Sequence, residues 1–165
     1  MKCRIVKLPQ LSGNKTTVYS VIFENDRKTL FDNFLIENSI SFKSEIEEMI
    51  IRLTTIGHKT GARDSFFRHN EGLPCDGVCA LKYKERKGRE NLRLYCIRYG
   101  TQIIILGGGG QKKVQALQDD EKLTKENYFL RRLSALISER IKERDIGYSE
   151  DFMEFMGDLN FEDYE

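Results

Sequence analysis

The chain has 165 residues and a formal net charge of +1, with 39% hydrophobic and 32% charged residues. This length suits one domain that buries a core without disulfides or metal ions. No run of 18 apolar residues occurs, the first ten residues lack the apolar segment of a signal peptide, and there is no Pro/Ser-rich tract. We therefore expect no membrane segment, no secretion and no low-complexity protein, but a cytoplasmic enzyme or binding protein.

The N-terminal third predicts a strand hairpin followed by a helical hairpin. Residues 3–8 and 17–24 are rich in β-branched and apolar residues and flank a Ser-Gly-Asn turn signal, so they predict two antiparallel strands. Asp26 is expected to cap a short apolar helix. Ser41 is expected to cap a second helix, which Gly57 ends.

The remaining apolar segments predict three strands and a long helix. After an irregular stretch, residues 78–84, 92–99 and 102–106 follow one another through tight connections and predict an antiparallel meander. Thr124 is expected to start a long helix with an apolar stripe. The predicted fold is α+β, with the helical hairpin and the C-terminal helix packed on an antiparallel sheet that also carries the N-terminal strand hairpin.

The charges divide the chain into two parts. Residues 149–165 hold seven acidic residues and no lysine or arginine, so residues 1–148 hold 27 basic and 19 acidic residues, a net +8. We therefore expect a basic domain over 1–148 and an acidic, aromatic tail over 149–165. A basic body favours a polyanionic partner. The tail either lies on the basic face as a mimic of nucleic acid or forms a C-terminal helix that joins the core.

The four cysteines predict neither a metal site nor a cofactor. Cys75 and Cys79 have three residues between them, and no histidine follows at the distance typical of a zinc finger. Cys3 and Cys96 alternate with polar residues in apolar segments, which favours buried thiols in a reducing compartment.

Basic and tyrosine side chains are predicted to share one face of the meander. Because side chains alternate across a strand, Lys82 and Lys84 lie on one side of their strand, and Arg93, Tyr95 and Tyr99 share one side of the next. Keeping the apolar faces together predicts Lys84 beside Arg93 and Lys82 beside Tyr95, with no carboxylate on that face. Such a face either binds single-stranded nucleic acid, through cations on phosphates and rings on bases, or simply meets solvent.

The order of these segments resembles the RelE/HigB/ParE family of bacterial toxins from type II toxin-antitoxin systems. The segment LRLYCIRY matches the family's strand of the form yRvly, with Arg93 at its arginine. Residues 103–106 match the following strand, and Gln111-Lys112-Lys113 match the paired lysines after it. The resemblance covers roughly residues 17–145. It implies a fold of helical hairpin, antiparallel sheet and terminal helix.

The resemblance also implies a function. RelE- and HigB-like members are cytoplasmic toxins that a cognate antitoxin neutralises, and they cleave mRNA, usually on the ribosome, without a metal ion. It implies catalysis by Lys82, Lys84 and Arg93, in which one lysine is the base for attack of an RNA 2′-OH and the arginine stabilises charge on phosphate. The implied RNA-binding residues are Arg86, Tyr95, Arg98, Tyr99, Lys112 and Lys113. The alternative is a non-catalytic binding protein, either a gyrase-directed inhibitor of the ParE type or a nucleic-acid-binding module.

Two further features lie near these residues. Four glycines at 107–110 stand where the family has other residues, and we expect a flexible turn there or a close approach of a phosphate to the backbone. His58 and His69 bound a basic irregular segment. Each is either a surface residue or a general acid or base.

Overall fold

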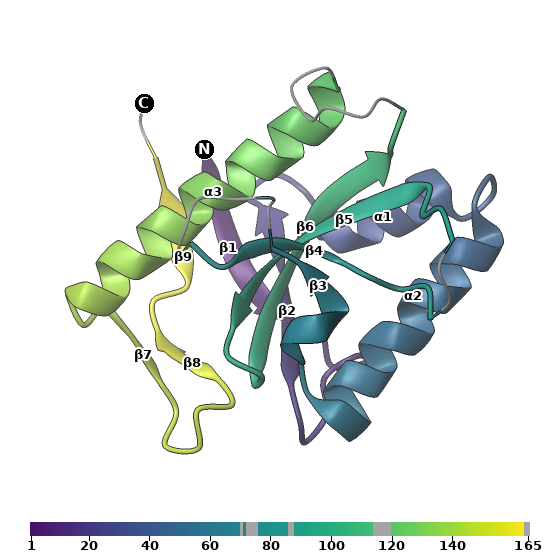
Figure 1. The fold of residues 1–165 in the computed structure, drawn as a ribbon. Coiled ribbons are helices and arrows are strands. Elements are labelled where there is room, and N and C mark those ends of the chain that lie inside the picture. Colours follow the sequence, from purple (N-terminus) through teal and green to yellow (C-terminus); the bar gives the residue numbers. More distant parts are fainter. Residues whose placement is uncertain (70, 72–75, 86–87, 114–119, 164–165) are drawn as a thin grey trace.

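The computed structural model describes residues 1–69, 71, 76–85, 88–113 and 120–163. Within these residues, three α-helices pack on a seven-stranded sheet, and a separate two-stranded hairpin lies beside it (Figure 1). The two ends of the described chain meet, because the Asp163 backbone N–H donates to the Met1 carbonyl oxygen at 2.9 Å. The three helices on a sheet confirm the predicted α+β class, and the antiparallel pairing of residues 3–7 with residues 19–23 confirms the N-terminal strand hairpin.

The elements follow one another in an order close to the predicted one. The helices are α1 (Leu30–Asn38), α2 (Lys43–Thr55), which continues as a π-helical turn η1 (Ile56–Thr60), and α3 (Glu121–Lys142), with a 3-10 turn η2 (Asp64–Phe66) between them. The strands are β1 (Lys2–Lys7), β2 (Thr17–Phe23), β3 (Phe67–Arg68), β4 (Val78–Leu81), β5 (Leu92–Tyr99), β6 (Ile103–Gln111), β7 (Ile146–Tyr148), β8 (Phe155–Gly157) and β9 (Asn160–Glu162). None of the helices in the described part of the chain has the length and apolar character needed to cross a bilayer.

The sheet is mixed, whereas an antiparallel sheet was predicted. Its strand order is β3-β4-β5-β6-β2-β1-β9, and the pair β2–β6 is parallel, with Thr17 opposite Ile103 and Ser20 opposite Leu106. The meander β4–β5–β6 and the hairpin β1–β2 are each antiparallel, as expected. The chain runs through α1 and α2 before it returns to the sheet, and this long crossover permits the parallel pairing.

Both faces of the sheet are covered, which makes two hydrophobic cores. One core lies under α1 and α2 and contains Leu94 and Ile104, while the other lies under α3 and contains Ile97 and Ile105. The apolar run 103–106 is fully buried in the centre of the sheet, as its lack of a polar side predicts.

Each helix begins at a residue other than the predicted one. Thr29 caps α1 in a capping box with Asp32, and Asp120 caps α3 by accepting from the Leu123 backbone N–H at 3.0 Å. Helix α2 has no side-chain cap, and the π-helical turn η1 carries the chain past Gly57, the expected stop. Several Ser, Thr and Asp residues precede each helix, so the choice among them depends on packing.

The glycines at 107–110 form the second half of β6 and are buried, so the expected flexible turn is wrong. A Cβ atom on Gly107 would lie 2.6 Å from a methyl carbon of Leu130 on α3, and one on Gly109 would collide with the carbonyl oxygen of Arg93. The glycines thus let α3 and β5 approach this strand more closely than any side chain would allow.

The C-terminal segment is part of the fold. Tyr148 of β7 pairs with Phe155 of β8, so the expected boundary after residue 148 falls inside one hairpin. Strand β9 adds to the sheet edge beside β1, and Phe155 and Phe161 are buried beneath α3. The segment is therefore not a C-terminal helix, and of the residues predicted to bind RNA it packs against Tyr99 through Phe155.

Candidate nucleic-acid interface

The pairing of β4 with β5 is shifted by two residues from the predicted register. Cys79 lies opposite Cys96 and Ala80 opposite Tyr95, and β4 ends at Leu81. The expected neighbours Lys82–Tyr95 and Lys84–Arg93 are therefore wrong. A shift of two residues keeps every side chain on its predicted face, so alternation alone could not distinguish the two registers.

The two tyrosines expected to contact RNA lie beneath α3. Tyr95 is 1% exposed, and burial raises the pKa of its hydroxyl. The Tyr99 ring packs edge-on against Phe155 at 5.1 Å between centroids, and burial raises the pKa of its hydroxyl. Neither ring is available to stack on a base, because α3 covers the face of the sheet on which strand alternation places them.

Four basic residues form what we call the cationic cluster: Arg68 on β3, Arg89 before β5, Arg93 on β5 and Lys112 after β6. The Lys112 backbone N–H donates to the Asn91 carbonyl oxygen at 2.8 Å, which fixes the lysine next to the start of β5. Burial, followed by the positive charges of Arg93 and Arg68, lowers the pKa of the Lys112 ammonium group. The cluster therefore favours an anion and also favours an uncharged amine at Lys112.

A carboxylate from the segment between β3 and β4 reaches this cluster, contrary to the predicted carboxylate-free face. Glu71 forms an ion pair with Arg93, and the two side chains are only 15% and 13% exposed. Asn127 and Arg131 of α3 hold residue 71 in place by donating to its carbonyl oxygen at 2.6 and 3.1 Å. Within the described part of the chain, the remaining N–H groups of the Arg93 guanidinium have no hydrogen-bond partner.

A second carboxylate organises the connection between β4 and β5. The Glu90 side chain is 8% exposed and accepts from Arg68 Nη2 at 2.7 Å. It also accepts from the backbone N–H groups of Tyr83 at 2.8 Å and Lys84 at 3.0 Å. Glu90 therefore fixes the backbone at Lys84 directly beside the cationic cluster.

A third carboxylate, which the sequence analysis missed, ties helix α2 to the same connection. Glu45 accepts from the Tyr83 hydroxyl at 2.6 Å and from the Asn91 backbone N–H at 2.9 Å. Burial acts to raise the pKa of Glu45, but these hydrogen bonds outweigh it and the pKa is lowered. The sequence held a signal, because Glu45 stands four residues before Met49 and so shares the buried face of the helix.

The other predicted residues are more dispersed. Lys82 and Lys84 follow β4 and are partly exposed, and Lys113 is exposed directly after Lys112. Arg98 lies toward the opposite end of β5, where its Nε donates to the Ala62 carbonyl oxygen at 2.8 Å. Arg86 lies outside the described residues.

None of the described histidines and cysteines belongs to the cationic cluster, and Cys75 lies outside the described residues. His69 Nε2 lies 3.1 Å from a carboxylate oxygen of Asp64. Cys3, Cys79 and Cys96 are buried free thiols, and burial raises the pKa of Cys3 to about 11 and that of Cys79 to about 12. Over the described ranges, no group of three His, Cys, Asp or Glu side chains is arranged to hold a metal ion.

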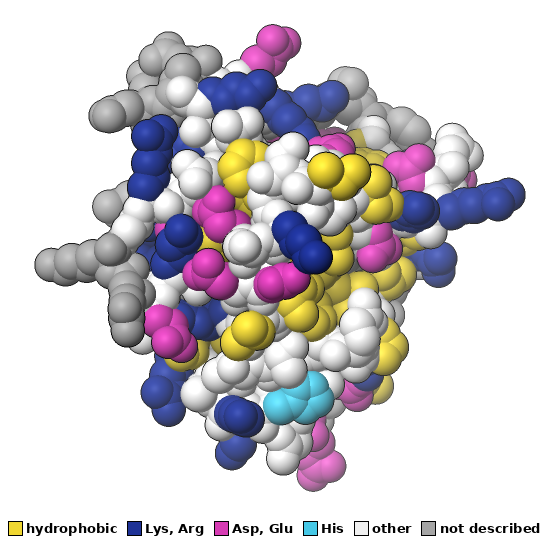
Figure 2. All heavy atoms as spheres, turned by 90° about the vertical axis from the view of Figure 1, so that its right-hand side faces the viewer, with side chains coloured by type: hydrophobic (Ala, Val, Ile, Leu, Met, Phe, Trp, Pro, Cys, Tyr) yellow, Lys and Arg dark blue, Asp and Glu magenta, His cyan; other side chains and the backbone are white. Residues whose placement is uncertain are grey.

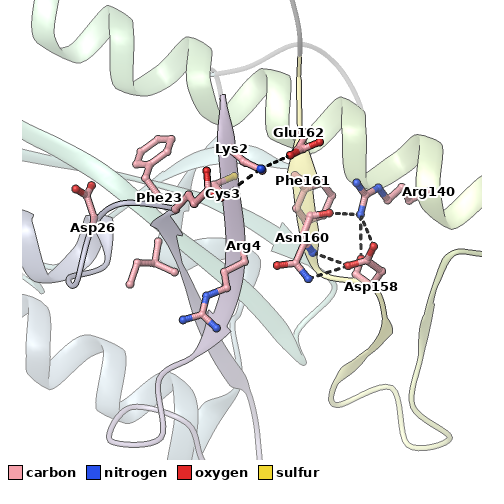
Figure 3. A pocket seen from close by; sticks show the side chains of 12 residues that line it. Lys2, Cys3, Arg4, Phe23, Asp26, Arg140, Asp158, Asn160, Phe161 and Glu162 are labelled. Carbon is pink, nitrogen blue, oxygen red and sulfur yellow. Dashed lines mark hydrogen bonds and ion pairs between the residues drawn. The ribbon is translucent and has the colours of Figure 1, made fainter.

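A pocket of about 700 Å³ lies at the far edge of the sheet, beside β9 and β1 (Figure 3). Its charged side chains are largely paired with one another: Lys2 lies 2.8 Å from Glu162, and Arg140 contacts Asp158 and the Asn160 carbonyl oxygen. Because these charges already have partners, the pocket is a weaker candidate for anion binding than the cationic cluster.

Comparisons with protein-family models, with curated proteins and with solved structures found no match to this chain.

Proposed function

We propose that this chain is a metal-independent endoribonuclease that cleaves mRNA, on the ribosome or free, as the toxin of a toxin-antitoxin pair. The observation that carries the proposal is the cationic cluster, which pairs among the described residues with the carboxylates of Glu71 and Glu90. The sequence resemblance to RelE- and HigB-like toxins supports the same substrate. Lys82, Lys84 and Lys113 extend the positive charge along the strand ends and suit the neighbouring phosphates.

The chemistry follows from which side chains can hold or release a proton. Lys112, as its uncharged amine, accepts the proton of an RNA 2′-OH while that oxygen attacks the adjacent phosphorus. Arg93 stabilises the negative charge on the phosphoryl oxygens, through the guanidinium N–H groups that Glu71 leaves free. A neighbouring lysine ammonium group donates a proton to the 5′ oxygen of the next nucleotide as the bond between that oxygen and phosphorus breaks. The products are a 2′,3′-cyclic phosphate and a 5′-hydroxyl end.

The decisive experiment compares messages after induction of the wild type, Lys112→Gln and Lys28→Gln. Lys28 is an exposed lysine outside the cluster and serves as the matched control. We expect new 5′ ends with the wild type and the control, and about a hundredfold fewer with Lys112→Gln, since the general base is lost. Unchanged cleavage by a folded Lys112→Gln protein would contradict the role of Lys112.

The pH dependence of cleavage sharpens the test. Because the pKa of Lys112 is lowered, the fraction of uncharged amine rises as the pH increases toward that pKa, and the rate should rise with it and then level off. Lys112→Arg keeps the positive charge at every pH and should abolish this rise. Initial rates on an oligoribonucleotide measure the profile.

A second candidate is a non-catalytic RNA-binding protein. One observation favours it: the Glu71 carboxylate already pairs with the Arg93 guanidinium, which the cleavage mechanism needs for phosphate. This candidate predicts affinity for RNA that falls steeply with salt, without strand cleavage. Binding measured together with the 5′-end map separates the two functions.

A further inference from the structure

A hollow of about 690 Å³ opens between α2 and the connection that links β4 to β5, outside the cationic cluster. It belongs to the side of the molecule that carries α1 and α2, where hydrophobic side chains gather among charged ones (Figure 2). Its lining comprises Glu48, Ile51, Arg52, Thr55, Phe66, Tyr83, Lys84, Glu85 and Gly88.

The walls of this hollow suit a flat, aromatic ligand. The Arg52 guanidinium lies 4.3 Å from the centroid of the half-buried Phe66 ring, which makes a stacked pair of planar groups. Ile51, which is 65% exposed, adds apolar surface, whereas the Tyr83 ring at the back of the hollow is only 2% exposed. Planar cations and aromatic rings are the groups on which unpaired nucleobases stack in single-stranded complexes.

The hollow also carries two positive charges, Arg52 over the Phe66 ring and Lys84, which acts electrostatically on the Glu45 carboxylate. In the described part of the chain, neither the Arg52 guanidinium nor the Lys84 ammonium forms a hydrogen bond or ion pair. Glu48 and Glu85 balance the total charge of the lining. The lining as a whole is formally neutral, so the ligand should present an uncharged ring, with any anionic group placed beside Arg52 or Lys84.

The hollow lies close to the cationic cluster, because Glu90 contacts a residue of each. One oxygen of Glu90 accepts from Arg68 of the cluster at 2.7 Å, and the other accepts from the backbone N–H of Lys84 at 3.0 Å. A single carboxylate thus separates the two sites. A strand with its phosphates on the cluster could place a neighbouring base in the hollow.

We infer that the hollow between α2 and the β4–β5 connection is a base-binding subsite, which takes one unpaired nucleobase of the RNA strand held at the cationic cluster. The base stacks on the Phe66–Arg52 pair, and Lys84 meets the phosphate that links this base to the strand. The inference rests on the proposed function for its substrate, but the subsite itself can be tested with a mononucleotide.

The first test records the methyl NMR signals of the full chain during titration with adenosine monophosphate. The Ile51 methyl groups should shift in a saturable way, because the ring current of the base acts on them, while those of Ile36, an exposed residue of α1 outside the hollow, should not. Ribose 5-phosphate, which lacks the base, should leave Ile51 unchanged. Equal shifts from both ligands, or none from the nucleotide, would overturn the inference.

The second test removes the ring while keeping apolar volume. Phe66→Leu, checked for native folding by its unfolding transition, should bind a single-stranded oligoribonucleotide about tenfold more weakly than the wild type. Its affinity for an abasic strand of the same length should be unchanged. Equal losses for both strands, or no loss for either, would overturn base binding by the hollow.

These tests distinguish the subsite from the proposed function. Lys112→Gln should lose cleavage but keep the adenosine monophosphate shift at Ile51. If the wild type shifts at Ile51 yet produces no new mRNA ends, the ribonuclease fails and the base-binding hollow stands. If the wild type cleaves mRNA but adenosine monophosphate causes no shift at Ile51, the base-binding hollow fails and the ribonuclease stands.

Discussion

Basic side chains lie both at the β9 edge of the sheet and at the strand ends near β3, but they have different partners at the two places. At the β9 edge, Lys2 lies 3.2 Å from Glu24 and 2.8 Å from Glu162, and Arg132 lies 2.5 Å from Asp163. At the β3 end, Arg68, Arg89, Arg93 and Lys112 share Glu71 and Glu90.

This difference shows what the acidic C-terminal segment does. Its carboxylates pair with cations of β1 and α3, and its aromatic rings fill the core beneath α3. None of its side chains reaches the cationic cluster in the described residues. The cationic cluster near β3 therefore depends on Glu71 and Glu90 among the described residues, and a polyanion would meet it there.

The largest test of this comparison concerns the core at the β9 edge. Phe161 is 1% exposed, so Phe161→Ala should lower the free energy of unfolding by about 4 kcal/mol, through lost burial and a residual cavity. Phe152 lies in the same segment but is 59% exposed, so Phe152→Ala is the matched control and should change the free energy of unfolding by less than about 0.5 kcal/mol. Denaturant unfolding measures both. Equal losses of stability at Phe161 and Phe152 would mean that burial of the C-terminal segment does not stabilise the fold.

The next test breaks the half-buried ion pair of the cationic cluster. Arg93→Met leaves Glu71 without its partner in a poorly solvated place, so the protein should lose about 3 kcal/mol of unfolding free energy. Adding Glu71→Gln should restore most of that stability without restoring cleavage. A double variant that is no more stable than Arg93→Met would argue against the pair.

A smaller, pH-dependent effect should appear at Glu45. Near neutral pH, Glu45→Gln should cost about 1.5 kcal/mol, since its hydrogen bonds lose an ionised acceptor. The pKa of Glu45 is lowered in the folded state, so its contribution is complete above pH 4.5 and is lost as the pH falls through the lower folded value. The difference in stability between wild type and variant should therefore shrink on acidification. A difference that is constant with pH would contradict this role.

The smallest effect should come from an exposed pair at the β9 edge. Lys7 and Glu154 pair while 43% and 42% exposed, so Lys7→Gln should change the free energy of unfolding by about 0.5 kcal/mol or less, and less still in high salt. Unfolding at two salt concentrations measures this. A large loss would show that the surface pairs of this edge, and not its buried rings, hold the C-terminal segment.

Most elements of the fold could be predicted because their signals are local. The alternation in 92–99 and the apolar run 103–106 identified β5 and β6, and the spacing of Phe129, Leu133 and Ile137 identified α3. The parallel pairing of β2 with β6 could not be predicted, because it joins segments more than 80 residues apart and leaves no pattern in either one.

The candidate site was predicted only in part. Arg93, Lys112 and the neighbouring lysines were identified from the sequence, whereas the Glu71 partner was not, because it comes from an irregular segment that α3 holds in place. The glycines at 107–110 were expected to form a turn, because their low strand propensity is local information and the closeness of α3 is not.

The sequence by itself determined the class of fold, the approximate positions of the three helices and of β1, β2, β4, β5 and β6, and the excess of positive charge outside the last 17 residues. Only the tertiary structure decided which face of the sheet α3 covers, the register of β4 on β5, and which cations keep a carboxylate partner. The physical reason is the separation along the chain between the residues that interact. Periodicity and turn chemistry act over a few residues, whereas register, burial and charge pairing depend on contacts between segments that are distant along the chain.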